Sequence, residues 1–103
     1  MHNGLFVGLI TLDFIYLAKS PPKNNQKIVA IDYNVAAGGP ATNAAVAFRY
    51  LGNQATVLGV LGSHPMTQLI REDLAKYQVA IADLHPTITT TVPVSSIIVT
   101  QAT

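Results

Sequence analysis

The chain has 103 residues, of which 50% are hydrophobic and only 11% are charged, and its formal net charge at pH 7 is +1. A typical soluble domain carries roughly 25% charged residues, so we expect further polypeptide or a partner to cover part of its apolar surface. The absence of cysteine excludes disulfides, thiolate zinc sites and a cysteine nucleophile, and the lack of a basic run argues against a nucleic acid partner.

The first apolar run, residues 5–12, predicts a strand buried on both faces of a parallel sheet. Asp13 follows it, and ligands of open parallel sheets bind beyond the carboxyl ends of the strands. A carboxylate accepts hydrogen bonds from two hydroxyls at once, so Asp13 is a candidate diol ligand; the alternative is an Asp that caps a turn through its own backbone. The longer apolar stretch 5–18 is not preceded by a basic stretch, is interrupted by Asp13, and is shorter than the roughly 20 residues of a membrane span. We therefore expect a cytoplasmic protein without a membrane partner.

Residues 20–27 have the composition of a loop, and residues 28–35 predict a strand with Tyr33 and Val35 on one face. The strand leads into Gly38 and Gly39, which permit backbone angles closed to other residues and leave room for a ligand.

A helix is predicted from Pro40, which suits a first helical position, to Leu51, where Gly52 ends it. Helical spacing places its inner face at Ala44, Ala47, Phe48 and Leu51. Asn43 lies in the first turn, where backbone N–H groups are free to hold a polar ligand.

Two stretches, Gly8 to Asp13 and the Gly38-Gly39 turn with Asn43 and a helix ending in Leu51-Gly52, resemble the opening motifs of the ribokinase-like (PfkB) family of carbohydrate and nucleoside kinases. The resemblance implies an α/β fold with a three-layer core around a mostly parallel sheet and a small β lid. It implies that residues 1–103 are the N-terminal part of one domain, with lid segments at approximately 14–37 and 87–103.

The next elements predict a βαβαβ unit: a strand over 55–62, a helix over about 65–77 with Ser63 as its N-cap, and a strand over 79–82. Met66, Leu69, Ile70 and Leu74 form the predicted inner face of this helix. The family commonly has Gly-Asp-Asp where this chain has Gly62-Ser63-His64, a departure that puts the identity of the sugar in doubt.

Residues 87–100 are dense in β-branched side chains and predict one long strand or a strand pair, with Pro93 at an edge or a bulge. By resemblance this is the second lid segment, and its expected partner is the strand over 28–35. An exposed edge of this composition pairs readily with another chain, which suggests a homodimer through the lid.

By resemblance, Asp13, Gly38, Gly39 and Asn43 bind the hydroxyls of a sugar or nucleoside in an ATP-dependent kinase. The Gly-Ala-Gly-Asp motif that supplies the catalytic base and phosphate site in the family is absent. We therefore expect no catalytic residue in this chain and place the ATP and Mg²⁺ ligands outside it.

His2, His64 and His85 are too scattered to indicate a metal site. The alternatives are a non-catalytic sugar-binding or dimerisation module, a nucleotide-binding fragment, or a structural α/β piece.

Overall fold

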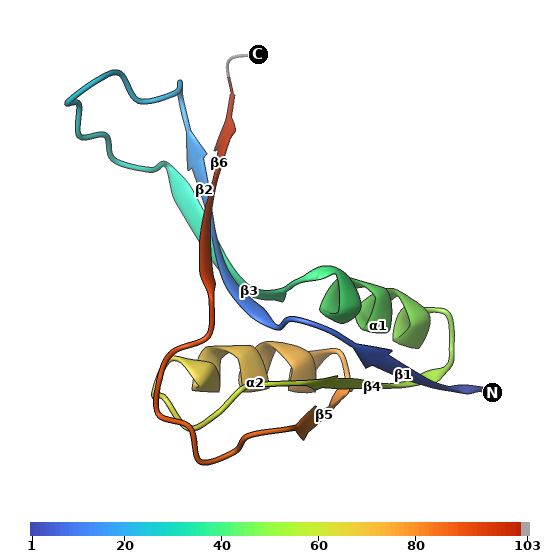
Figure 1. The fold of residues 1–103 in the computed structure, drawn as a ribbon. Helices are drawn as coiled ribbons and strands as arrows, with labels where there is room; N and C mark the ends of the chain where they lie inside the picture. Colours follow the sequence, from blue (N-terminus) through green and yellow to red (C-terminus); the bar gives the residue numbers. More distant parts are fainter. Residues whose placement is uncertain (102–103) are drawn as a thin grey trace.

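The computed structural model describes residues 1–101, which form two three-stranded sheets and two helices (Figure 1). The elements in chain order are β1 (Asn3–Val7), β2 (Thr11–Ala18), β3 (Asp32–Gly38), α1 (Pro40–Tyr50), β4 (Gln54–Gly59), α2 (Thr67–Lys76), β5 (Ala80–Asp83) and β6 (Val94–Thr100). Neither helix in this part of the chain has the length and apolar character needed to cross a membrane.

Strands β1, β4 and β5 form the main sheet in that order, and all of them are parallel. Helix α1 packs on β1 and β4, and α2 packs on β5 and also on β3. Alternate residues of β4, namely Ala55, Val57 and Gly59, are buried, as expected for a strand with one covered face. The predicted parallel βαβαβ unit is confirmed.

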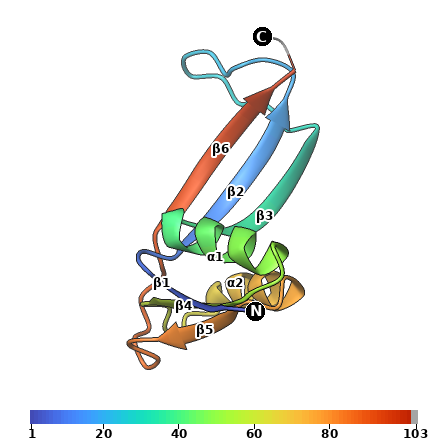
Figure 2. The same ribbon diagram turned by 90° about the vertical axis from the view of Figure 1, so that its right-hand side faces the viewer.

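The other face of the main sheet is apolar and open within the described residues. Leu5 and Val7 of β1 pair in register with Thr56 and Leu58 of β4, and the side chains of Leu5 and Val7 are 61% and 65% exposed. Both helices lie on the opposite face, between the main sheet and the second sheet (Figure 2). The low charged fraction of the sequence therefore corresponds to one uncovered sheet face.

Strands β3, β2 and β6 form the second sheet in that order, with β2 in the centre. Strand β2 is antiparallel to β3 and parallel to β6. This sheet projects away from the main sheet and the helices (Figure 1). Strands β2 and β3 overlap the expected lid segment of approximately 14–37, with β2 beginning before it, and β6 lies in the expected segment of 87–103; residues 28–31 and 87–93 are outside the strands. The role of these segments as a lid stays a prediction. Of the expected segment 87–103, residues 102–103 lie outside the described part of the chain.

The single strand predicted over residues 5–12 is wrong, because the run is divided between β1 and β2. The Gly8 N–H still donates to the Leu58 carbonyl oxygen at 3.1 Å, and the chain then leaves the main sheet. A Cβ at Gly8 would lie 3.0 Å from the Cβ of Ala41, so glycine lets α1 approach closely where the chain bends. Asp13 is consequently the third residue of β2, and not the first residue after a strand.

The predicted pairing of the last strand is also wrong. Strand β6 pairs with β2, from Leu12 with Val94 to Ala18 with Thr100, while β3 lies on the other side of β2. The sequence analysis placed residues 14–18 in the first lid segment but assigned them to no strand, although they are mostly apolar and form the greater part of the central strand β2. Because β2 lies between them, the two predicted lid strands do not meet.

Helix α1 buries a different face from the one predicted. Thr42 and Ala45 are its buried residues, whereas Ala44, Ala47 and Leu51 are exposed and only Phe48 of the predicted face packs against the core. Most residues of this helix are small, so the spacing of its hydrophobic residues carries little information about which face is buried. Its predicted end is confirmed, because Gly52 has a φ of 94°.

Helix α2 buries Ile70 and Leu74, as predicted, but Leu69 is 38% exposed. Ser63 is not its N-cap: the cap position is Met66, without a side-chain hydrogen bond. The Ser63 hydroxyl instead donates to the Ile88 carbonyl oxygen at 3.2 Å. The Ser63 side chain, which was expected to cap the helix, is therefore hydrogen-bonded to the loop that follows β5.

Candidate functional site

The Gly38-Gly39 turn lies where β3 ends and α1 begins. Gly39 has φ 98° and ψ 150°, a region of backbone space that is essentially restricted to glycine. A Cβ on Gly39 would lie 2.2 Å from the carbonyl oxygen of Leu9. Both the backbone angles and the lack of space therefore require glycine here.

Asp13 lies directly against Gly38. A Cβ built on Gly38 would be 2.0 Å from Oδ2 of Asp13 and 2.7 Å from the hydroxyl oxygen of Thr11. Thr11 pairs with Gly38 across the antiparallel β2–β3 register, and its hydroxyl donates to Oδ1 of Asp13 at 2.8 Å. The absence of a side chain at Gly38 thus leaves room for the carboxylate of Asp13.

Asn43 is exposed in the first turn of α1, and its backbone N–H donates to the Gly39 carbonyl oxygen at 2.9 Å. The N-cap residue Gly39 offers no side-chain hydrogen bond to the helix. Backbone N–H groups at such an end are available to a polar ligand. The structure therefore brings Asp13 against Gly38, and it gathers Gly38, Gly39 and Asn43 within one turn.

The sequence analysis missed Thr11 as a member of this site. Residues two apart in a strand lie on the same face, so a strand over 11–18 would have placed Thr11 beside Asp13. The signal was lost because residues 5–12 were assigned to one strand ending before Asp13. By the same alternation and the β2–β3 register, Asn34 lies on the face that carries Asp13.

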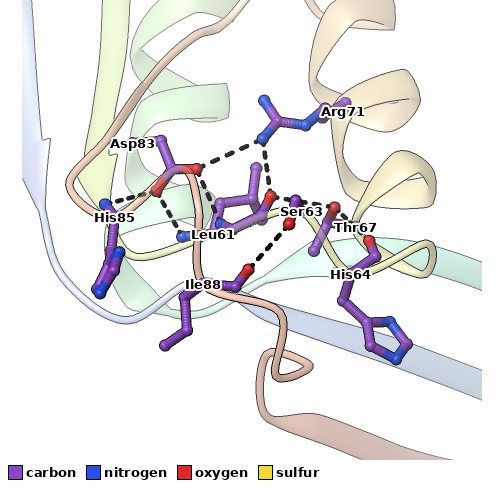
Figure 3. Close-up of polar contacts among 9 residues, drawn as sticks. Leu61, Ser63, His64, Thr67, Arg71, Asp83, His85 and Ile88 are labelled. Carbon is purple, nitrogen blue, oxygen red and sulfur yellow. Dashed lines mark hydrogen bonds and ion pairs between the residues drawn. The ribbon is translucent and has the colours of Figure 1, made fainter.

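A second polar cluster surrounds Asp83 at the end of β5 (Figure 3). Its Oδ1 accepts hydrogen bonds from the Leu61 and His85 N–H groups, both at 3.0 Å, and its Oδ2 accepts from the Gly62 N–H at 2.8 Å. Arg71 of α2 lies 3.4 Å from the same Oδ2 atom. Asp83 therefore joins the loop after β4 to β5 and to α2.

The side chain of Asp83 is only 9% exposed. Burial by itself raises the pKa of this carboxyl, but the N–H groups of Leu61, His85 and Gly62, together with the Arg71 guanidinium, lower the pKa below its ordinary value. The group is held as a carboxylate by donors that all belong to the protein. We assign it a structural role, which the sequence analysis did not predict because its other partners, Leu61, Gly62 and Arg71, lie 12 to 22 positions away in the chain.

No group of three or more His, Cys, Asp and Glu side chains in residues 1–101 is arranged to hold a metal ion. The histidines predicted to be too scattered for a metal site do not contact one another in the bonds described: the backbone N–H of Met66 donates to Nδ1 of His64, and the backbone N–H of His2 donates to Asn53. The position of the ATP and Mg²⁺ ligands stays a prediction.

The model of the pfkB family of carbohydrate kinases matches residues 1–103, which is the whole of this chain. The chain therefore belongs to the PfkB carbohydrate kinase family, and its α/β architecture is the ribokinase-like fold.

Solved structures with the same fold include an Agrobacterium tumefaciens protein assigned as a ribokinase, at 24% identity and a TM-score of 0.82, with 96% of this chain and 32% of that chain covered. Escherichia coli phosphofructokinase-2, in complex with substrates and products, has 19% identity and a TM-score of 0.80, with 99% and 31% covered. Arabidopsis thaliana ribokinase, complexed with ribose and ATP, has 22% identity and a TM-score of 0.72, with 95% and 32% covered. The present chain thus spans about a third of the length of these proteins.

Proposed function

We propose that this chain forms the acceptor-binding part of an ATP-dependent carbohydrate kinase, which transfers the γ-phosphoryl group of ATP to a sugar hydroxyl. Family membership supports the reaction class. The observation that carries the assignment of the site is the Asp13 carboxylate lying against Gly38, immediately before the uncapped N-terminus of α1.

Asp13 has the chemistry to orient a sugar. Thr11 occupies one hydrogen-bonding position of its Oδ1 atom, but an ionised carboxylate has about four lone-pair positions. The remaining positions accept hydrogen bonds from the hydroxyls of a diol. Fixing the acceptor in this way reduces the entropy cost of phosphoryl transfer.

The two glycines have different roles in this proposal. Ala37 donates its N–H to a side chain on the far side of β3 from β2, so the alternation of an antiparallel ladder directs the N–H of the next residue, Gly38, toward β2. Gly38 therefore contributes the space that the Asp13 carboxylate occupies, and not a free N–H group for the sugar. Gly39 turns the chain so that the first turn of α1, with the Asn43 amide, faces the same region.

The catalytic base and the ligands of ATP and Mg²⁺ are placed by family resemblance outside residues 1–103. Bound Mg²⁺ neutralises the charge that develops on the transferred phosphoryl group. In this proposal residues 1–103 bind and orient the acceptor, and the second sheet is the lid over it. The cysteine-free composition suits the reducing cytoplasm, where we place the enzyme.

The test uses the longest polypeptide that the gene encodes and a panel of pentoses, hexoses, sugar phosphates and nucleosides. ATP consumption identifies the acceptor, and calorimetry measures its affinity. Asp13→Ala is expected to weaken acceptor binding at least about tenfold, since it removes charged hydrogen bonds. Asp32→Ala is the matched control, because Asp32 is an exposed Asp of the same sheet whose described bond is local, to the Tyr33 N–H. Unchanged acceptor affinity in Asp13→Ala would refute the site.

A second candidate function is a non-catalytic sugar-binding or dimerisation module. The observation that favours assembly is the edge position of β6 in the second sheet, with Val94, Ile97, Ile98 and Val99 between 42% and 50% exposed. Edge strands with exposed apolar residues pair with other chains. Acceptor binding without ATP consumption by the longest encoded polypeptide would favour this candidate over the kinase.

A further inference from the structure

Helix α2 packs against β3 at the root of the second sheet, and one of its side chains adds a hydrogen bond to the backbone there. Oδ2 of Asp73 accepts a hydrogen bond from the backbone N–H of Ala37 at 2.9 Å, across 36 positions of sequence. Ala37 is the residue before Gly38 and is 9% exposed. The bond therefore lies next to the turn that carries the proposed acceptor site.

The geometry of the ladder explains why this N–H needs a partner. Ala37 pairs with Leu12 of β2, and β3 is an edge strand of its sheet. At a pair whose N–H groups point outward, the edge strand has no neighbour to accept the hydrogen bond. Asp73 supplies the acceptor. A nearly buried N–H group without one would be destabilising.

Helix α2 is itself fixed to the main sheet. Ile70 and Leu74 are fully buried against the core, and Arg71 contacts Asp83 of β5 at 3.4 Å. Asp73, two residues after Arg71, extends to β3. One helix thus contacts the main sheet through Ile70, Leu74 and Arg71, and it contacts β3 of the second sheet both by packing and through the hydrogen bond of Asp73.

We propose that Asp73 is a positioning residue that sets the Gly38-Gly39 turn against Asp13. The inference rests on the proposed function, because the turn matters to the reaction only if it borders the acceptor. Loss of the Asp73 carboxylate leaves Asp13 in place on β2 and loosens the end of β3, so the distance between the Gly38-Gly39 turn and Asp13 is less well defined. The expected consequence is weaker acceptor binding with little effect on ATP.

The variants are Asp73→Ala, which removes the acceptor atom, and Asp73→Asn, which retains one carbonyl oxygen able to accept from Ala37. Glu72→Ala is the matched control, since Glu72 is the neighbouring acid on α2 and its described bond is to the exposed Gln68 amide at 3.5 Å. All three are made in the longest polypeptide that the gene encodes.

The first readout is amide hydrogen exchange without any ligand. In Asp73→Ala the Ala37 amide is expected to exchange about tenfold faster, the increase that corresponds to one lost hydrogen bond, while the Val57 amide in β4 is unchanged. Asp73→Asn should recover most of the protection, and Glu72→Ala should behave as wild type. Unchanged exchange at Ala37 in Asp73→Ala would overturn the anchor, as would equal acceleration at Ala37 and Val57.

The second readout is the KM of the acceptor that the panel identifies. We expect Asp73→Ala to raise it about tenfold while the KM of ATP stays constant, with rescue by Asp73→Asn. Lost protection at Ala37 with an unchanged acceptor KM would overturn the positioning role.

If Asp13→Ala leaves acceptor affinity unchanged, the proposed site fails, and the exchange result still decides separately whether Asp73 anchors β3. If Asp73→Ala does not fold, Asp73→Asn carries both readouts, and rapid exchange at its Ala37 amide with wild-type acceptor KM would equally overturn the proposal.

Discussion

Oδ2 of Asp13 occupies the space that a side chain at position 38 would need, because a Cβ on Gly38 would lie 2.0 Å from it. Gly38→Ala is therefore expected to displace the Asp13 side chain or β3, and to cost about 1–3 kcal/mol of stability as an overpacked site. Adding Asp13→Ala removes the main obstacle, so the double variant should recover part of that loss. Urea unfolding of the two single variants and the double variant measures the coupling, and strictly additive losses would contradict the contact.

Thr11→Val should lower acceptor affinity severalfold, because it removes the hydrogen bond of 2.8 Å that orients Asp13, worth about 1 kcal/mol. Thr11→Ser retains the hydroxyl and should bind nearly as wild type. Calorimetric titration with the acceptor compares the two. Equal acceptor affinities of the Thr11→Val and Thr11→Ser variants would show that acceptor binding by Asp13 does not depend on this bond.

Gly39→Ala and Gly52→Ala separate the effect of backbone angle from that of space. Both glycines have positive φ, 98° and 94°, but a Cβ at Gly39 meets the Leu9 carbonyl oxygen at 2.2 Å whereas a Cβ at Gly52 has nothing within 4 Å. We expect Gly52→Ala to cost about 1 kcal/mol of stability and Gly39→Ala more than about 3 kcal/mol. Thermal or urea unfolding measures both, and similar losses would contradict the close approach at Gly39.

The lowered pKa of Asp83 gives a pH dependence with a defined sign. A carboxyl with a lower pKa in the folded state stabilises the protein fully above its unfolded value of about 3.9, and this contribution disappears as the pH falls through the folded value. Asp83→Asn should therefore be less stable by about 2 kcal/mol at pH 7. Its stability should also fall less steeply than that of wild type below about pH 4.

The measurement is the free energy of unfolding in urea between pH 7 and pH 3. Asp32→Asn, at an exposed position of β3, is the control and should follow the wild-type curve. Parallel curves for wild type and Asp83→Asn would contradict the role assigned to the Asp83 cluster.

Homodimerisation through the lid predicts a concentration-dependent mass. Ile97→Lys, on the edge strand β6 where Ile97 is 42% exposed, should shift the protein toward the monomer because a charge on an edge strand opposes pairing. Val29→Lys is the control, since Val29 is 88% exposed and outside the strands. Light scattering over a hundredfold range of concentration tests both, and a wild-type monomer throughout would refute the proposal.

The local signals in the sequence were sufficient where chain chemistry acts on its own neighbours. Glycine at 39 and 52 and Pro40 at a helix start specified the turn and the two ends of α1. The apolar run over 55–62, which follows that helix, specified the parallel unit. The same local chemistry identified Gly38, Gly39 and Asn43 as one turn. Such features depend on φ, on a missing Cβ or on spacing within a few residues, and are therefore readable without a fold.

The tertiary structure decided every feature that depends on residues distant in the chain. Only the bend at Gly8 divides an apolar run into β1 and β2, and only the pairing of β2 with both β3 and β6 places Thr11 and Asp13 beside Gly38. The contacts of Asp73 with Ala37 and of Asp83 with Leu61 span 36 and 22 positions. A buried carboxylate is recognisable in a sequence only when its donors are near in sequence, and here all of the donors except the His85 N–H come from other elements of the fold.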